Sequence, residues 1–476
     1  MVVAVAIAVA ATLTVRLVIS ATDHSRLRSE VKLLEAEGGS ANVLDLLPRP
    51  LGRKPGAPVA LLTAEQFSWP YPKVGQGTEN ADFADANVSE AAKIGRAFGE
   101  YTSWLPSAYG FTVPAAKPNE PVPQRNEAWF PYLEKMTTDN KDSIDFVRRT
   151  ADGPPAMFKT VWTQGAMITL SHLSRLGRVA KLLSADAAVR LHKGDEAGAV
   201  QDVQTVLKLR LLIDDDPVAL SKLTAFRMDS VAFETLMMIL SKGHPDRAAI
   251  GKVLQELDGR EKRNRLTAML FGETAIDMDT FRTMGKDMET FLLMTEGSVA
   301  NPLSLEKQVR TWLHMAAWHR TADECSFLKA MREIRARSRM EFPQILDGIA
   351  HHTPAPASGT PFTALTPDLI RALPGLFYEE AGADARVRIT RAAVALYLYR
   401  MDTGTFPATL DALIPKYLKE SQTDPYSGKP LIYRQTKGGY LLYSIGEDRK
   451  DDGGNPTVDV TWQCDAPQST GKPQGQ

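Results

Sequence analysis

The residues with the clearest chemical potential form a short acidic segment near the C-terminus, from Glu447 to Gly454. It contains Asp448, Asp451 and Asp452, and Asp459 follows on the next predicted strand. Carboxylates grouped on a loop with glycines are the ligands that a hard cation such as Ca²⁺ prefers. The sequence therefore predicts a candidate calcium site at Asp448, Asp451, Asp452 and Asp459. The competing interpretation is a solvated turn whose charges protect a sheet edge from aggregation.

One feature weakens the predicted metal site, and another argues against a known catalytic motif anywhere in the chain. Arg449 and Lys450 interrupt the acidic segment, and positive side chains there weaken a metal site. The chain also has no G-x-S-x-G, H-E-x-x-H, Walker A, C-x-x-C or G-x-G-x-x-G motif. The sequence thus identifies no catalytic residue, although residues from distant positions can still assemble a site.

The acidic segment needs a scaffold, and the residues before it predict one. Apolar positions at helical spacing predict an amphipathic helix from Ala385 to about Thr403, ended by Gly404. A short helix should follow from Ala408 to Leu413, and the turn-forming residues Asp424 to Gly428 should reverse the chain.

Three strands complete the predicted scaffold. Leu431 to Arg434 and Tyr440 to Ile445 are rich in β-forming residues and are joined by a Gly-Gly turn. Val458, Val460 and Trp462 alternate with polar residues, which predicts a third, half-buried strand. The expected unit is a helix followed by a three-stranded antiparallel sheet.

This order of phrases resembles the soluble domain of the major pseudopilin of type II secretion. The matching stretches are Tyr399 to Pro407, Leu413 to Tyr433 and Tyr440 to Gly454, within about 70 of the 476 residues. The resemblance implies an α+β fold, protein partners in an envelope assembly, and a calcium-binding loop in which Asp448 matches a family Asp. The chain departs from the family because most of it precedes the match, and Met1 to Ser20 shows no prepilin cleavage phrase.

The N-terminal run Met1 to Ser20 is apolar apart from Arg16, so we expect a transmembrane anchor or an uncleaved signal segment. Basic residues follow the run (Arg26, Arg28 and Lys32), which by the positive-inside rule would keep the body in the cytoplasm. The resemblance implies the opposite. We expect a single pass through a bacterial inner membrane with the bulk of the chain in the periplasm, and a basic leader upstream of Met1 would reconcile the two.

The middle of the chain predicts helices. Ala180 to His192 and Ala197 to Ile213 read as a helical hairpin joined at Gly194-Asp195, within a larger helical bundle. The triplet Asp214 to Asp216 could bind a metal, but Asp216 as N-cap before Pro217 explains it better.

Together these observations predict a mainly α protein with a small α+β C-terminal domain. The expected divisions are an anchor at 1–20, a Pro- and aromatic-rich region at 21–156, a helical domain at 157–342, a Pro-rich linker at 343–384, the pseudopilin-like domain at 385–463 and a disordered tail at 464–476. Two cysteines, Cys325 and Cys464, lie in different predicted domains, and the sequence does not decide whether they form a disulfide.

The net charge of −1 provides no long-range field that would recruit nucleic acid. We therefore expect a membrane-anchored, extracytoplasmic, non-catalytic component of a secretion- or envelope-related assembly, with Ca²⁺ as its only candidate cofactor. Two alternatives stay open. One is an envelope hydrolase that acts on polysaccharide or peptide through the aromatic N-terminal region, and the other is a soluble helical scaffold.

Overall fold

The computed structural model describes residues 21–47, 89–109, 127–151, 158, 160–258, 265–284, 317–351 and 366–464. These residues are mostly α-helical, with a small three-stranded antiparallel sheet near the C-terminus, as the sequence predicts. The expected anchor at 1–20, the parts 48–88, 110–126 and 152–156 of the predicted Pro- and aromatic-rich region, and the tail from 465 lie outside the described residues. Among the described helices, none combines the length and apolar character that a membrane span requires.

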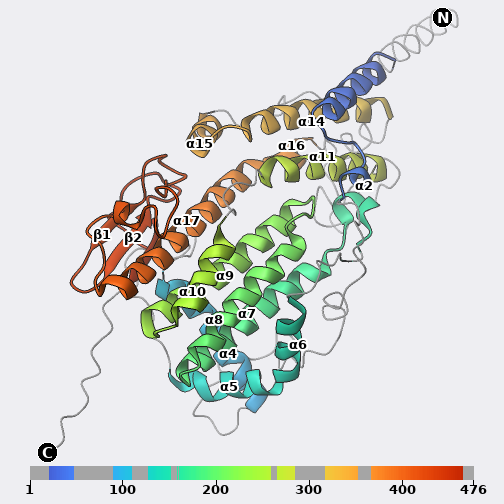
Figure 1. Cartoon of the computed structure of the whole chain (residues 1–476). Helices are drawn as coiled ribbons and strands as arrows, with labels where there is room; N and C mark the ends of the chain where they lie inside the picture. The colour runs from blue at the N-terminus through green and yellow to red at the C-terminus, as the bar shows by residue number, and fades with distance from the viewer. Residues whose placement is uncertain are drawn as a thin grey trace, which may run out of the picture.

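The lower part of the molecule in Figure 1 is a helical bundle centred on α7, α8 and α9. Its helices are α4 (Glu90–Tyr109), α5 (Phe130–Asp139), α6 (Lys141–Ala151), α7 (Ser171–His192), α8 (Glu196–Leu209), α9 (Ala219–Lys242) and α10 (Arg247–Leu257). Short 3-10 turns join them: η1 (Glu127–Trp129), η2 (Trp162–Met167) and η3 (Arg210–Ile213). The predicted hairpin is confirmed as α7 and α8, where Asp195 caps α8 by accepting the Gly198 N–H at 3.0 Å.

The acidic triplet before α9 is arranged differently from the prediction. Val218, not Asp216, occupies the N-cap position of α9, and it makes no side-chain cap. Asp216 instead accepts a hydrogen bond from the Ser221 hydroxyl at 2.9 Å. Asp214 turns inward and pairs with Arg210 at 3.0 Å and with Lys222 at 3.6 Å. Two of the three carboxylates therefore hold the start of α9 through side-chain contacts, which explains the triplet without a metal.

A second layer of helices lies above the bundle in Figure 1. It contains helical residues 21–36 together with α2 (Val43–Leu46), α11 (Arg265–Met284), α14 (Ala317–Arg337), α15 (Phe342–His351) and α16 (Thr366–Arg371). The N-terminal helical residues lie along α14 and are fixed by ion pairs from Glu30 to Arg332 at 2.7 Å and from Glu37 to Arg335 at 3.0 Å.

Helices also occupy the described parts of 343–384, where the composition predicts a linker. Pro343, Pro367 and Pro374 each fall in the first turn of a helix, α15, α16 and α17 respectively. Proline is tolerated there because the first backbone N–H groups of a helix have no partner within the helix. In the described parts of this stretch these three prolines mark helix starts, while the other three prolines fall in 352–365, outside the described residues.

The C-terminal unit combines one long helix with the sheet. Helix α17 (Leu373–Thr403) begins 12 residues before the predicted Ala385 and ends at Gly404, which adopts φ 83°. After η4 (Leu410–Leu413) come β1 (Ile432–Gln435), β2 (Tyr440–Ser444) and β3 (Val460–Cys464). The strand order is β1-β2-β3, and both pairs are antiparallel, as predicted.

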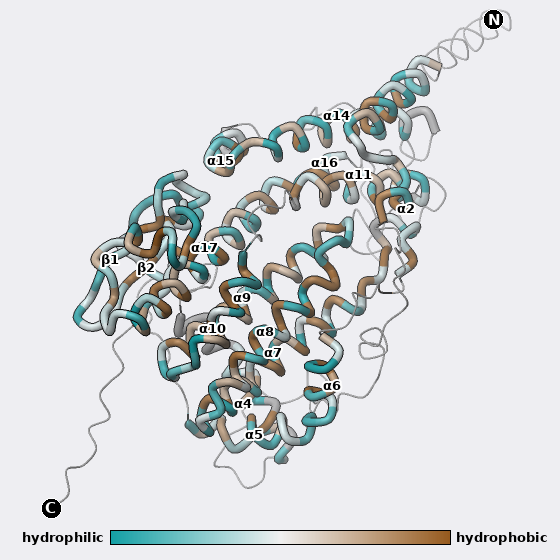
Figure 2. Tube along the Cα trace, in the orientation of Figure 1, coloured by the Kyte–Doolittle hydropathy of each residue, from teal (hydrophilic) through white to brown (hydrophobic). Residues whose placement is uncertain are grey.

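The bundle and the C-terminal unit share one hydrophobic core. A single cluster of buried residues runs from Leu183 and Leu236 in the bundle to Leu396 on α17 and Trp462 on β3. Apolar segments of α7, α8 and α9 accordingly run through the interior of the bundle in Figure 2. Tyr397 adds a polar link, because its hydroxyl donates to the Pro245 carbonyl between α9 and α10 at 3.2 Å. Helix α17 is thus covered by the sheet and by the chain's own bundle.

Candidate functional site: an acidic loop folded over the sheet

The predicted calcium loop covers the outer face of the sheet. Tyr443 of β2 is fully buried, and its hydroxyl donates to Asp451 Oδ1 at 2.8 Å. A Cβ at Gly454 would lie 2.7 Å from the Leu441 side chain, so the loop backbone touches the sheet at that point. The Arg434 guanidinium lies 5.4 Å from the centre of the Tyr443 ring. The loop therefore forms the second wall of the sheet, opposite α17.

Asp459 is the buried carboxylate of this loop. It is 2% exposed and lies just before β3, although the alternating pattern predicts it on the polar side of the strand. Its Oδ2 accepts the Gly454 N–H at 2.8 Å and the Asn455 N–H at 3.0 Å. Its Oδ1 has no hydrogen-bond partner, and burial raises the pKa of Asp459 to about 6. The nearby charges of Asp452 and Asp451 raise it further.

The other predicted ligands remain at the surface. Asp448 is exposed and accepts the Lys450 N–H at 3.1 Å. Asp451 also accepts the Gly453 N–H at 3.0 Å, and the hydrogen bond from Tyr443 lowers its pKa. Asp452 is exposed. The structure thus places all four predicted residues on one loop, with one of them buried and three at its surface.

Arg449, which the sequence suggests would compete with a cation, points away from these carboxylates. Its backbone has φ 60°, and its guanidinium pairs with Asp347 on α15. Gly428, in the turn before β1, lies near Pro343 of the same helix. The positive charge of Arg449 is therefore used to dock the loop on α15 rather than to neutralise the acidic segment.

The loop carries the types of ligand atom that Ca²⁺ prefers, but its carboxylates are not gathered around one point. The loop offers carboxylate oxygens, one of them buried without a partner, on a backbone with glycines at positive φ. Across the described parts of the chain, however, no three His, Cys, Asp or Glu side chains come close enough together to hold a metal ion. Calcium at Asp448, Asp451, Asp452 and Asp459 therefore stays a prediction.

The predicted turn at Asp424 is hydrogen-bonded to the end of β2, just before the acidic loop. Asp424 is 2% exposed and accepts hydrogen bonds at both oxygens. Oδ1 accepts the Ser444 hydroxyl at 2.6 Å and the Tyr426 N–H at 3.0 Å, and Oδ2 accepts the Ser427 hydroxyl at 2.9 Å. The turn is in this way bonded to the end of β2, where the acidic loop begins.

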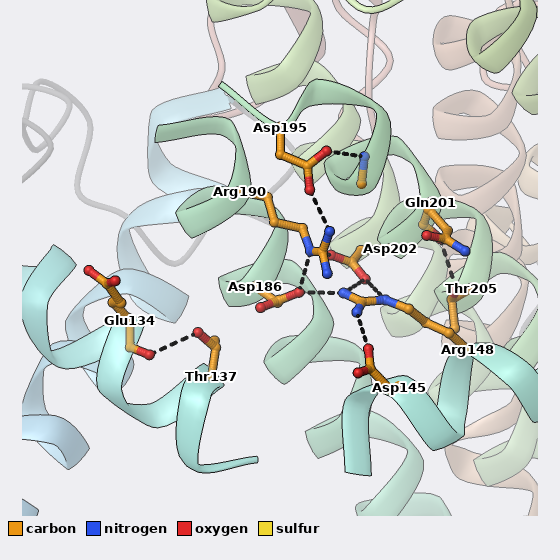
Figure 3. Close-up of polar contacts among 11 residues, drawn as sticks. Glu134, Thr137, Asp145, Arg148, Asp186, Arg190, Asp195, Gln201, Asp202 and Thr205 are labelled. Carbon is orange, nitrogen blue, oxygen red and sulfur yellow. Dashed lines mark hydrogen bonds and ion pairs between the residues drawn. The ribbon is translucent and has the colours of Figure 1, made fainter. Parts of the chain in front are cut away.

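A buried ion-pair network in the bundle was not expected from the sequence (Figure 3). Arg148 of α6 donates to Asp202 of α8 at 2.8 Å and also pairs with Asp186 of α7. Arg190 donates to Asp186 at 2.7 Å and to Asp195 at 2.5 Å. Asp202 is fully buried, and burial raises its pKa well above the usual range. The network fastens α6 to the α7–α8 hairpin, although the second oxygen of Asp202 (Oδ2) has no hydrogen-bond partner.

Further carboxyl groups are buried without being predicted. Glu234 on α9 is 2% exposed, and burial raises its pKa to about 8 despite the charges of Arg386 and Lys181. Burial also raises the pKa values of Glu273 and Asp277, one turn apart on α11. The sequence gives little sign of this burial, because Glu and Asp are common residues in helices.

The two cysteines, Cys325 and Cys464, are both buried, and they form no disulfide with each other. The Cys325 thiol donates to the Asp23 carbonyl at 3.7 Å, and burial raises its pKa to about 11. A thiol with such a high pKa is a poor nucleophile at neutral pH.

The chain is similar to a known protein over only a small part of its length. No family model matches the chain, and no solved structure matches it. The type II secretion system core protein G of Pseudomonas aeruginosa is 34% identical over 95 residues. The alignment takes in 16% of this chain, which spans 66% of the length of that protein. The chain is thus similar, over a small part of its length, to a pseudopilin of type II secretion.

Proposed function

We propose that the chain is a non-catalytic component of a secretion- or envelope-related assembly and that it works through protein contacts. The observation that carries the proposal is the C-terminal unit, in which a long helix, the Asp424 turn and an antiparallel sheet occur in the order that resembles a pseudopilin domain. The partial similarity to core protein G supports the same role.

In this proposal Met1 to Ser20 anchors the chain in a bacterial inner membrane, and the rest lies in the periplasm. The apolar character of the run supports an anchor. The helical residues 21–36 that follow it lie at one end of the molecule in Figure 1, against α14 and on the far side of the upper layer from the bundle. An anchor would thus enter the fold at its periphery, leaving the sheet and acidic loop free for partners.

Calcium would add stability to the loop in the same setting. Asp459 would hold the ion from within the fold, with Asp451, Asp452 and Asp448 supplying oxygens from the surface. A bound divalent cation would offset the repulsion between the carboxylates and the cost of burying Asp459. Supporting this, Arg449 is engaged by Asp347 and does not compete.

Affinity purification tests the proposed role. The full chain, tagged after Gln476, is expressed in a bacterium with a type II secretion system, cross-linked in the cell and purified. We expect core protein G or another secretion component to be enriched. A Trp462→Asp variant, which places a charge at a fully buried position of β3, should lose this enrichment, while the exposed Gln463→Asp change should retain it. Enrichment of no secretion component with the native chain contradicts the proposal.

A further inference from the structure

The outer edge of β1 is a part of the sheet whose backbone remains open. The Thr436 N–H donates to the Gly439 carbonyl at 3.0 Å, which fixes the residues of β1 that face β2. Bonded and non-bonded pairs alternate along an antiparallel ladder, so Arg434 faces β2 while Tyr433 and Gln435 turn their N–H and C=O groups outward. Among the described residues, no backbone hydrogen bond reaches these outward groups.

The other sides of the sheet are covered. Helix α17 packs on the inner face, the acidic loop covers the outer face, and β3 lies against α17, α9 and α4. The start of β1 is closed as well, because the Leu431 N–H donates to the Gln422 carbonyl at 2.9 Å. What stays open is the stretch from Tyr433 to Gln435. Natural sheet edges are commonly blocked by proline, a bulge or charged side chains; β1 has no proline, and Arg434 is its one charged residue.

We propose that this edge, Tyr433 to Gln435, binds an extended acidic segment of a partner protein, which adds to the sheet as a fourth strand. Main-chain hydrogen bonds would supply affinity and the facing side chains would supply specificity. The side chain of Arg434 is 53% exposed, lies 3.7 Å from the exposed Asp451 carboxylate, and would lie opposite the central residue of the added strand. Lys429 and Lys437 are exposed before and after β1. Opposite charges across a strand pair are favourable, so an acidic residue is the fitting partner.

A second copy of this chain fits the edge poorly. In the register that uses both open residues, the two copies would set their Arg434 side chains directly opposite each other. Like charges in that position destabilise a strand pair. The inference goes beyond the proposed role in secretion, since it concerns the chemistry of any segment that docks on the sheet.

Hydrogen exchange on the full chain in detergent tests the inference. The probes are the blocked peptides acetyl-Thr-Val-Glu-Val-Thr-amide and acetyl-Thr-Val-Lys-Val-Thr-amide, added at millimolar concentration. We expect the Glu peptide to slow exchange of the Tyr433 and Gln435 amides and to bind about 5-fold more tightly than the Lys peptide.

Two substitutions at one position separate strand addition from other binding. Gln435→Pro removes the outward N–H at an edge position where proline is tolerated, and it should abolish the protection at Tyr433. Gln435→Ala loses the same side-chain bond to the Phe406 carbonyl but keeps the N–H, so it should bind as the native chain does. Unchanged exchange with the Glu peptide, equal binding of both peptides, or binding retained in Gln435→Pro would each overturn the proposal. So would a dimer in solution that Gln435→Pro dissociates, because the occupant would then be a second copy. None of these results depends on secretion components.

Discussion

Asp459 accepts the backbone N–H of Gly454 at 2.8 Å through one carboxylate oxygen and buries the other without a partner. The contact pins the end of the acidic loop to the start of β3. It also leaves a desolvated oxygen close to Asp451 and Asp452, whose charges act on it. A buried carboxylate in this state is costly when ionised, and a cation would relieve the cost.

The first prediction concerns calcium. At a concentration ten times its Kd, Ca²⁺ should raise the free energy of unfolding by about 1.4 kcal/mol, measured by urea denaturation. Asp459→Asn should abolish this gain, because it removes the buried ligand charge. Glu420→Gln removes an exposed charge outside the loop and should preserve the gain. A native chain indifferent to millimolar Ca²⁺ rules out the calcium loop.

The second prediction concerns the contact between Gly446, just before the acidic loop, and Val458, just before β3. A Cβ at Gly446 would collide with the Val458 carbonyl oxygen, whereas the position of a Cβ at Gly453 is nearly open. Both glycines have positive φ, so alanine at either should lose about 1 kcal/mol of stability from backbone strain. Gly446→Ala should lose clearly more than Gly453→Ala in urea denaturation. Equal losses would show that Gly446 does not pack against Val458 as described.

The third prediction concerns the ion-pair network of Figure 3. Arg148→Met leaves Asp202 and Asp186 buried without their main positive partner, so the free energy of unfolding should fall by about 3 to 5 kcal/mol. Arg149→Met changes an exposed residue on the same helix and should have little effect. Equal stabilities of the two variants would mean that the network contributes nothing to the bundle.

The fourth prediction concerns pH. The folded-state pKa of Glu234 is raised to about 8, above its unfolded value near 4, so its contribution to stability is fully present below about pH 4 and is lost as the pH rises to 8. Glu234→Gln should remove this loss and gain on the order of 5 kcal/mol at pH 8 relative to the native chain. Unfolding measured from pH 4 to 9 tests it, with the exposed Glu333→Gln as control. If the stability of Glu234→Gln changes with pH in the same way as that of the native chain, Glu234 does not have a raised pKa.

Local features of the sequence predict most of the C-terminal unit. Gly404 ends α17, and the Gly438-Gly439 turn joins β1 to β2, because glycine is suited to positive φ and tight turns. The α7–α8 hairpin follows equally from apolar periodicity and the Asp195 cap. Such features need no knowledge of distant contacts.

Other features depend on contacts between residues far apart in the chain. The burial of Asp459 follows from the loop folding back at Gly454, which strand alternation does not encode. Arg148 meets Asp202 across 54 residues, and neither residue is unusual in its own helix. The true start of α17 is hidden because Pro374 looks like a linker residue until the helix is known to begin beside it. The core shared by α17 and the bundle also joins residues far apart in the chain, so local sequence patterns do not reveal it.

The placement of the C-terminal unit outside the cytoplasm is the central claim, and reporter fusions after Gln476 test it most directly. Alkaline phosphatase, which is active only outside the cytoplasm, and a fluorescent protein that folds only inside it are fused to otherwise identical full chains. The account predicts active phosphatase and a dark fluorescent fusion. A fluorescent fusion with inactive phosphatase would contradict it.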